Sequence, residues 1–283
     1  MSLESTIADL AAASREQTSV VAGKMTEIDK SVAAAVKAIP ELHKNIYLSN
    51  DGNDDNDGSQ STPLKTIQSA CNRVPRGGSA TIYLRSGDEY YVREIAGDWW
   101  QFVNIDSKTI FITSYGNGAS PVIKMKLSVW TSVNGYQYHV AAGFATNGGG
   151  FLIVEGCDIE TPKLPVGSNG PASFIIGGLF SIESGGASET TPYGGGELPL
   201  GLVRCNIRIN DYQLASFNGL SKLFLDTVAF SFDGNQAKAF IQKGSHGVNI
   251  VSAKDIEIPE GMAITDMFSK FTASNTLSNL SFP

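Results

Sequence analysis

The chain has 283 residues and a net charge of −7, and its 21 Lys and Arg residues are scattered along the sequence. Because it has no basic stripe to neutralise phosphates, we do not expect a nucleic-acid partner. No stretch reaches the run of about 18 apolar residues that a membrane span needs, and the N-terminus lacks the basic segment and apolar run of a signal peptide. We therefore expect neither membrane insertion nor export by that route.

Composition divides the chain near Pro40. Nine alanines precede residue 39, whereas only Gly23 of the 30 glycines precedes residue 46. An alanine-rich segment favours helix, and a glycine-rich segment with few charges favours turn-rich β structure. We predict an oligomerisation or attachment helix over 1–40, a linker and cap over 41–78, and a β domain over 79–283.

The N-terminal segment carries a seam at alternating steps of three and four, with one extra step of four between Val21 and Met25. The seam is apolar except at the weak pair Ser14 and Gln17. This spacing is typical of a coiled-coil seam with one stutter, and Pro40 is expected to end the helix. The alternative is a lone amphipathic helix that lies on the β domain, but the narrow seam favours assembly with copies of itself. The residues predicted to hold the copies together are Ile7, Leu10, Val21, Met25, Ile28 and Val32.

The linker contains Asn53-x-Asp55-x-Asp57-Gly58, which has the alternating oxygen ligands of a calcium loop. Its twelfth position is Leu64, where such a loop needs a bidentate Glu. Turn chemistry is the simpler interpretation, because Asp, Asn and Gly tolerate left-handed backbone. A calcium site at Asn53, Asp55 and Asp57 is kept as the alternative.

Two segments carry a resemblance to known proteins. Asn45–Gly58 with Pro63-Leu64-Lys65-Thr66-Ile67-Gln68-Ser69-Ala70 resembles the capped entry to the right-handed β-helix of phage tail spikes, tail fibres and pectate-lyase-like proteins. Leu3–Ala8, Val20–Lys24 and Glu27–Asp29 resemble the N-terminal helix of many phage tail-fibre proteins. The resemblance covers about the first 95 residues and implies a homotrimer in the virion, with Ile67 and Ala70 facing inward under the cap.

Four later segments repeat one apolar spacing. In each, residues two apart face one side of a strand, and a step of three then marks a bend. The segments are Leu152-Val154-Cys157-Ile159, Leu202-Cys205-Ile207-Ile209, Leu223-Leu225-Val228-Phe230-Phe232 and Val248-Ile250-Ala253-Ile256-Ile258. This pattern predicts stacked coils of a β-solenoid, with an ordinary β-sandwich as the alternative.

The intervals between these segments suggest one hidden coil. Cys157 and Cys205 are 48 positions apart, about twice the other intervals, and Phe174-Ile176-Leu179 has the required spacing between them. Ile82-Leu84-Gly87 and Ile110-Ile112-Tyr115 fit more weakly upstream. Cys71, Cys157 and Cys205 are predicted to be buried thiols rather than catalytic or metal-bound ones.

Candidate sites are few. Polysaccharide hydrolysis on a β-helix needs two carboxylates about 5 to 9.5 Å apart, and Asp226 with Asp211 or Asp233 could supply them from neighbouring coils. Solvated face and turn residues are the favoured interpretation of these three. The aromatic residues that could stack on sugars, if they are not core or interface, are Trp99, Trp100, Tyr136, Tyr138 and Tyr193. The three histidines have no partner at catalytic or metal spacing, so no cofactor is expected.

Taken together, the sequence predicts a mainly β protein with a right-handed parallel β-helix of about seven coils, preceded by a helix that forms a trimeric coiled coil. The resemblance implies a phage tail-fibre or tail-spike subunit in the virion that attaches to the host surface and is not an enzyme. Its expected partners are its own copies, other tail or baseplate proteins, and a host polysaccharide or receptor. The alternatives are a capsule or lipopolysaccharide depolymerase and a purely structural connector.

Overall fold

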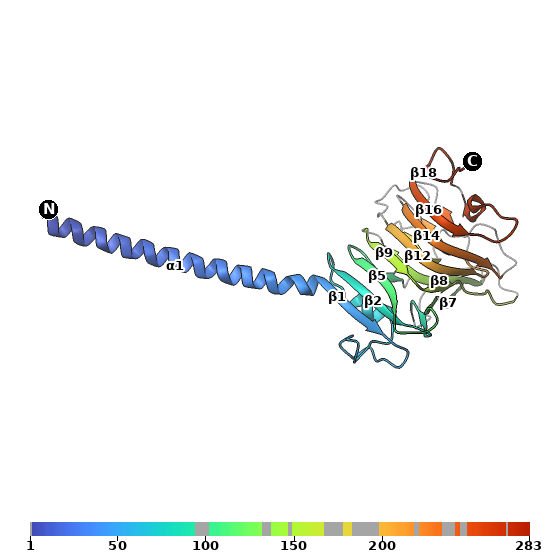
Figure 1. The fold of residues 1–283 in the computed structure, drawn as a ribbon, viewed down its shortest axis with the longest axis horizontal. Helices are drawn as coiled ribbons and strands as arrows, with labels where there is room; N and C mark the ends of the chain where they lie inside the picture. Colours follow the sequence, from blue (N-terminus) through green and yellow to red (C-terminus); the bar gives the residue numbers. More distant parts are fainter. Residues whose placement is uncertain are drawn as a thin grey trace. The chain divides into compact units, whose positions relative to one another are not determined.

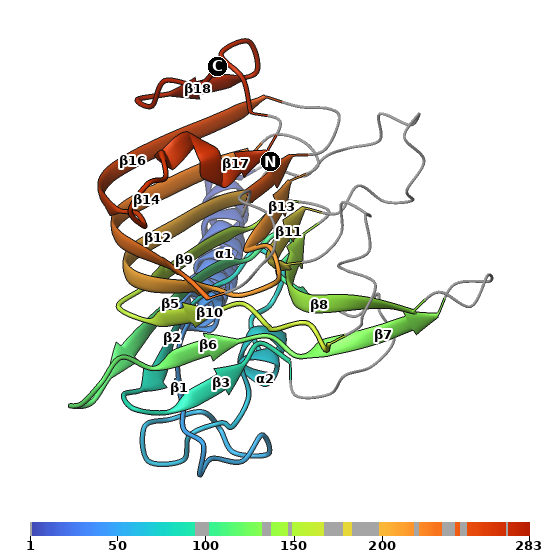
Figure 2. The ribbon, with the colours of Figure 1, turned by 90° about the vertical axis from the view of Figure 1, so that its right-hand side faces the viewer.

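The computed structural model describes residues 2–93, 102–131, 137–146, 149–166, 178–182, 198–217, 221–233, 241–243, 248–269 and 271–283. The chain divides into two compact units, Met1–His43 and Lys44–Pro283 (Figure 1). The first unit is a single long helix, and the second is mainly β, with a parallel sheet that curls into a half-barrel (Figure 2).

Helix α1 spans Leu3–Leu42, and the side chain of Ser2 caps its first turn by accepting a hydrogen bond from the Ser5 backbone N–H. The expected stop at Pro40 is wrong, because the helix continues to Leu42. A proline in the last turn removes only a single backbone hydrogen bond, which the helix end tolerates. Among the described residues, no helix has both the length and the apolar character needed to cross a membrane.

The described residues of the β unit form two sheets whose strand pairs are parallel, apart from the antiparallel pair β7 and β8. The described strands of the larger sheet are β1 (His43–Leu48), β2 (Ser79–Arg85), β3 (Glu89–Tyr91), β5 (Thr109–Tyr115), β6 (Val122–Lys124), β9 (Phe151–Glu155), β10 (Asp158–Glu160), β12 (Leu198–Ile209), β14 (Ser221–Phe232), β16 (Asn249–Glu257) and β18 (Thr276–Ser278). Those of the smaller sheet are β4 (Val103–Asn104), β7 (Leu127–Thr131), β8 (Gln137–Thr146), β11 (Gly178–Ile182), β13 (Ala215–Phe217), β15 (Ile241–Lys243) and β17 (Phe268–Ser269). Two short helices, α2 (Ile67–Asn72) and the 3₁₀ helix η1 (Ile264–Met267), complete the described elements.

Neighbouring strands follow the order of the chain. In the larger sheet β1, β2, β5, β9, β12, β14, β16 and β18 lie side by side, and β3, β6 and β10 form a second line that continues onto the later half of β12. The smaller sheet forms a third line of neighbouring strands, also in chain order: β4, β8, β11, β13, β15 and β17. From β2 onward, the chain therefore visits three lines of strands in turn before it returns to the first.

A single left-handed residue marks the bend between the first two lines. Arg204, Thr227 and Asp255 have φ values of 50°, 57° and 51°, and Gly156 has a φ of 64°. The strand register places these four residues beside one another. One such residue turns the strand and lets both of its arms keep their apolar side chains on the core. The bend predicted from the step of three is thus confirmed.

The core is built from columns of equivalent residues. Ile110, Leu152, Leu200, Leu223 and Val251 lie opposite one another in successive strands, and each is at most 1% exposed. Because the parallel strands pair in register, equivalent inward side chains of successive strands stack on one another. They form a continuous, buried apolar column.

The repeat predicts that the first apolar residues of the four segments, Leu152, Leu202, Leu223 and Val248, form one column, and two of them lie elsewhere. Leu202 is buried, but it lies opposite Val154 and Leu225, one inward position further along the strand. Val248 is 56% exposed and precedes β16, and Val251 takes the inward place. The register of β16 differs because its bend falls at Asp255, so the inward residues before that bend are Val251 and Ala253.

The hidden coil between Cys157 and Cys205 is also a wrong prediction. Strand β9 pairs directly with β12 and β10 with the later half of β12, so these two cysteines are neighbours in the stack. Leu179 lies in β11 of the smaller sheet, and Phe174 and Ile176 fall outside the described residues. The long interval reflects a longer path between neighbouring strands, which residue spacing cannot distinguish from an added coil.

Both ends of the stack are covered by the chain itself. At the first end, α2 buries Ile67 and Ala70, as the resemblance implied, and Leu64 forms a bridge to Leu48. At the other end, β18 pairs with β16. There the ring of Phe282 contacts those of Phe268 and Phe271 at centroid distances of 5.3 and 5.9 Å. Covered ends keep apolar side chains and unpaired backbone groups away from solvent.

The three cysteines are unpaired and buried, as predicted. Burial raises the pKa of Cys71 to about 12 and that of Cys205 to about 11. Burial also raises the pKa of Cys157. All three are therefore protonated, unreactive thiols at neutral pH.

Candidate functional site

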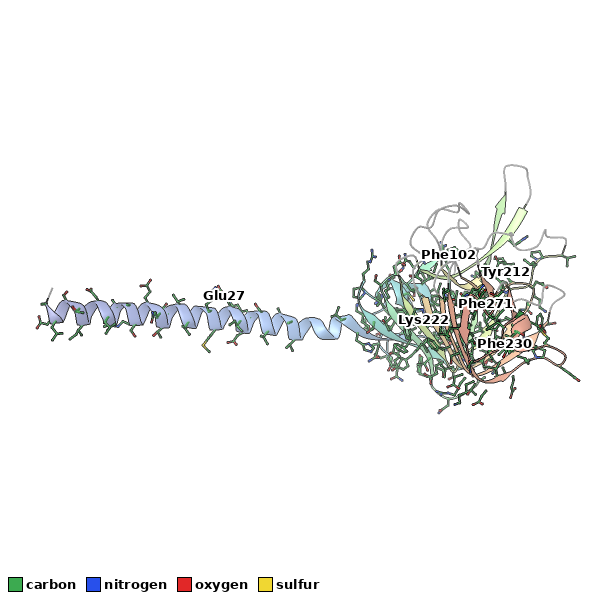
Figure 3. The ribbon with its side chains drawn as sticks, turned by 90° about the horizontal axis from the view of Figure 1, so that it is seen from above. Glu27, Phe102, Tyr212, Lys222, Phe230 and Phe271 are labelled. Atoms are coloured by element: carbon green, nitrogen blue, oxygen red, sulfur yellow. The ribbon has the colours of Figure 1, made fainter. Side chains whose placement is uncertain are left out.

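Helix α1 carries the first candidate site, an apolar stripe. The predicted seam residues are Ile7, Leu10, Val21, Met25, Ile28 and Val32, and their exposed fractions range from 55% to 72%. The side chains of the helix, Glu27 among them, project outward in Figure 3. The ion pair between Lys24 and Glu27, at 2.9 Å, lies on the helix surface and is worth little. Exposed apolar side chains at seam spacing are suited to packing against another helix.

The carboxylates proposed for catalysis fall into two places. Asp233 forms an ion pair with Lys163 at 2.9 Å, and Asp211 accepts a hydrogen bond from the backbone N–H of Leu164, also at 2.9 Å. The structure thus brings Asp211 and Asp233 to one short stretch of chain. The hydrogen bond from Lys163 lowers the pKa of Asp233, so this carboxylate is ionised and already paired.

Asp226 does not belong to that group. It precedes the bend of β14, and its carboxylate lies 3.8 Å from the Nζ of Lys254 in the neighbouring strand β16. Asp233 follows the same strand, beyond the bend. The structure therefore unites Asp211 with Asp233 and leaves Asp226 on the other arm of the sheet.

The residues proposed for calcium are engaged in turns. The side-chain oxygen of Asn53 accepts a hydrogen bond from the Asp55 backbone N–H at 3.0 Å. Asp57 accepts from the Ser59 backbone N–H at 2.9 Å and from the hydroxyl of Thr62, and the latter bond lowers its pKa. Among the described residues, no three His, Cys, Asp or Glu side chains gather as a metal site. These contacts favour the turn interpretation.

The aromatic residues proposed for sugar contact are not placed by the structure. Trp99, Trp100, Tyr136 and Tyr193 lie outside the described residues. Tyr138 lies in β8 opposite Trp130 of β7, and its side chain is also outside the description. Their role therefore stays a prediction.

Three other tyrosines lie on the outside of the larger sheet. Sequence reasoning missed Tyr47 and Tyr83, and its placement of Tyr115 at an inward position of the repeat is wrong, because the Tyr115 ring lies against that of Tyr47. The ring of Tyr47 stacks on that of Tyr83 at 4.6 Å and meets the edge of Tyr115 at 5.2 Å. All three are half-buried. Beyond Tyr83 in β2, Arg85 forms ion pairs with Asp51 at 2.8 Å and Asp88 at 2.9 Å.

The sequence did contain a signal for two of these tyrosines. Tyr47 and Tyr83 each stand between two aliphatic residues, in Ile46-Tyr47-Leu48 and Ile82-Tyr83-Leu84. Alternation in a strand sends such a central residue outward. Half-exposed aromatic rings beside charged groups are a surface that a sugar ring can contact.

Comparison with known proteins does not assign the chain to a family. No family model matches the chain, and no curated protein or solved structure matches it.

Proposed function

We propose that this chain is the subunit of a trimeric phage tail fibre or tail spike that attaches to the surface of the host cell. One observation carries the proposal: a helix of 40 residues with an exposed apolar stripe joins a stack of parallel strands covered at both ends. The helix joins the copies of the chain, and the stack of strands forms a stiff body. The sequence resemblance to phage tail-fibre helices and capped β-helices agrees with this combination.

The proposed architecture of the β unit is a right-handed β-helix of about seven coils. Three features support it: three lines of strands visited in turn, chain order within each line, and a left-handed residue at the same bend of successive strands. Parallel strands joined by crossover connections are right-handed in nearly all proteins. Such a stack has only nearest-neighbour contacts, so it can be long and rigid.

The proposed assembly is a trimer held by the stripe of α1. A carboxylate in a coiled-coil seam must lose its hydration without a partner, so Ile28→Asp should abolish the trimer. The β unit should keep its fold, because Ile28 is 59% exposed in the single chain. Light scattering on the full chain measures the mass, and circular dichroism of the β signal checks the fold.

The matched control is Thr26→Asp, which adds the same charge on the opposite side of α1, off the predicted seam. It should remain trimeric. An Ile28→Asp protein with the mass of the trimer would refute this role for the stripe.

Attachment is tested with purified full-length protein and purified host capsule or lipopolysaccharide. We expect binding without any increase in reducing ends or unsaturated sugars. Antibody labelling of phage particles should place the protein on the tail. A particle without label, or a chain that binds no host surface, would leave the connector alternative as the better proposal.

The depolymerase alternative rests on Asp211 and Asp233, which bind neighbouring residues: Asp233 pairs with the cation of Lys163, and Asp211 accepts from the backbone N–H of Leu164. A lyase needs a base and a cation close together, so this group is where such activity would be sought. New sugar ends that disappear in Asp233→Asn would favour the enzyme. The ion pair already formed by Asp233 favours a structural role.

A further inference from the structure

Two of the three cysteines occupy equivalent positions in neighbouring strands. The pairing of β9 with β12 before the bend and of β10 with β12 after it has the same offset of 48 positions, so the register places Cys157 beside Cys205. Between these pairings, the backbone N–H of Gly156 donates to the carbonyl of Val203 at 3.0 Å, which keeps the register through the bend. Each cysteine is the first inward residue after the bend, and both are at most 1% exposed. The core therefore contains two adjacent thiols.

The sulfur of Cys205 lies close to the strand that precedes Cys157. Its Sγ atom is 3.4 Å from the carbonyl oxygen of Val154 in β9 and 3.3 Å from that of Val203. Burial raises the pKa of Cys205 to about 11, and a hydrogen bond from the backbone of Cys157 opposes this rise. Burial, and after it the proximity of Cys205, raises the pKa of Cys157. Each cysteine is thus part of the immediate surroundings of the other.

The spacing of these strands is compatible with a disulfide. Neighbouring strands lie about 4.8 Å apart, and the two Cα atoms of a disulfide lie about 4.4–6.8 Å apart. On the other side of Cys205 the equivalent residue is Val228, and on the other side of Cys157 it is Pro121. Cys71 lies in α2, outside this column. Each of the two thiols therefore has the other as its cysteine neighbour in the column.

We propose that Cys157 and Cys205 are a redox-sensitive pair, which a hydroperoxide converts into a disulfide between neighbouring strands. One thiolate attacks an oxygen of hydrogen peroxide, breaks the O–O bond, becomes a sulfenic acid and releases hydroxide. The second thiolate attacks the sulfur of the sulfenic acid, forms the S–S bond and releases a second hydroxide. The two thiol protons and the two hydroxide ions give two molecules of water. The two thiols are thereby oxidised, and one peroxide is reduced.

The disulfide would join the strands that have the longest connection. Paired residues differ by 48 positions between β9 and β12, and by at most 42 positions elsewhere in the line from β2 to β18. A cross-link restricts the unfolded chain more when it closes a longer loop. Burial keeps both thiols protonated in the closed stack, so oxidation needs local opening of the strands. Both thiols belong to one chain, so the disulfide does not depend on assembly through α1.

The test is oxidation of the full chain with hydrogen peroxide a few degrees below its melting temperature, where local opening is frequent. Free thiols are then blocked with N-ethylmaleimide in denaturant, and the digested protein is mapped by mass spectrometry. We expect a pair of peptides linked through Cys157 and Cys205, and a blocked, unlinked Cys71. The oxidised protein should melt about 5–10 °C higher than the reduced protein. Dithiothreitol should reverse both changes.

The matched control is Cys71→Ala, which removes a buried thiol outside the pair. This variant should keep the rise in melting temperature on oxidation, whereas Cys205→Ala should lose it. If Cys205→Ala does not fold, the peptide map of the unmodified sequence still decides. Cys157 and Cys205 that are both unlinked after oxidation, a link to Cys71 or a link between chains would overturn the proposal. A disulfide that leaves the melting temperature unchanged would overturn its role as a cross-link of the stack.

Discussion

At the scale of single residues, Thr227 is the most demanding position of the β unit. A β-branched side chain at a φ of 57° is strained, and a left-handed conformation costs a residue other than glycine about 1–2 kcal/mol. Its equivalents in the neighbouring strands are Arg204, Asp255 and Gly156, and only the last is free of this cost. The bend is kept because both arms of the strand bury their apolar side chains.

Thr227→Gly should therefore stabilise the β unit by about 0.5–1 kcal/mol, since the relief of strain exceeds the entropy cost of glycine. Ser231→Gly, in the same strand with ordinary extended backbone, should destabilise it by about 0.5–1 kcal/mol. Urea denaturation followed by circular dichroism measures both. Equal shifts for the two variants would mean that the bend at Thr227 stores no strain.

At the scale of elements, the cap over the first end depends on Asp54. Its carboxylate accepts hydrogen bonds from the backbone N–H groups of Lys65 and Thr66, each at 3.0 Å, and from the Thr66 hydroxyl at 2.7 Å. Thr66 is in turn the N-cap of α2. Partial burial raises the pKa of Asp54, but these hydrogen bonds outweigh it and hold the pKa below its ordinary value.

A carboxylate with a depressed pKa adds stability above the pKa of the unfolded chain, and loses it as pH falls through the folded value. Asp54→Asn should cost about 1 kcal/mol at pH 7, because hydrogen bonds to a charged acceptor are the stronger ones. The cost should shrink toward zero below the ordinary value of 3.8. Urea denaturation at pH 7 and pH 3 measures it. Asp55→Asn, at an exposed position, is the control, and a cost for Asp54→Asn that is the same at both pH values would contradict this assignment.

Several features of the β unit could be predicted from the spacing of apolar residues alone. The bend, the inward Leu152 and Val154, and the cap with Ile67 and Ala70 follow from local alternation and turn chemistry, and all are found in the structure. The register of β16 could not be predicted in this way. Val248 and Ile250 are apolar and two apart, yet the inward set is Asn249, Val251 and Ala253.

The burial of Asn249 explains why the register of β16 could not be predicted from the sequence. This residue is polar but completely buried, and its side chain accepts from the Ser221 hydroxyl at 2.7 Å and donates to the Asn275 carbonyl at 3.3 Å. Ser221 lies in the neighbouring strand β14 and Asn275 directly precedes β18, so Asn249 finds its hydrogen-bond partners only once the strands are stacked. The candidate site was harder for the same reason. The group of Tyr47, Tyr83 and Tyr115 consists of outward residues from separate strands, and only the register brings their rings together.

At the scale of the whole molecule, stability should depend on protein concentration. If copies assemble through α1, dilution shifts the equilibrium toward separate chains and lowers the melting temperature. We expect the helical circular-dichroism signal at 222 nm to melt several degrees lower after about a hundredfold dilution. Ile28→Asp should melt at the same temperature at every concentration.

The dependence of the melting temperature on salt is a second, independent test of assembly through α1. The stripe of α1 is apolar, whereas each copy has a net charge of −7. Raising NaCl to about 1 M screens repulsion between copies and leaves apolar contacts intact, so the melting temperature of the assembly should rise. An assembly held by ion pairs would respond in the opposite direction. A melting temperature that falls with salt would therefore exclude an apolar seam as the force that joins the copies.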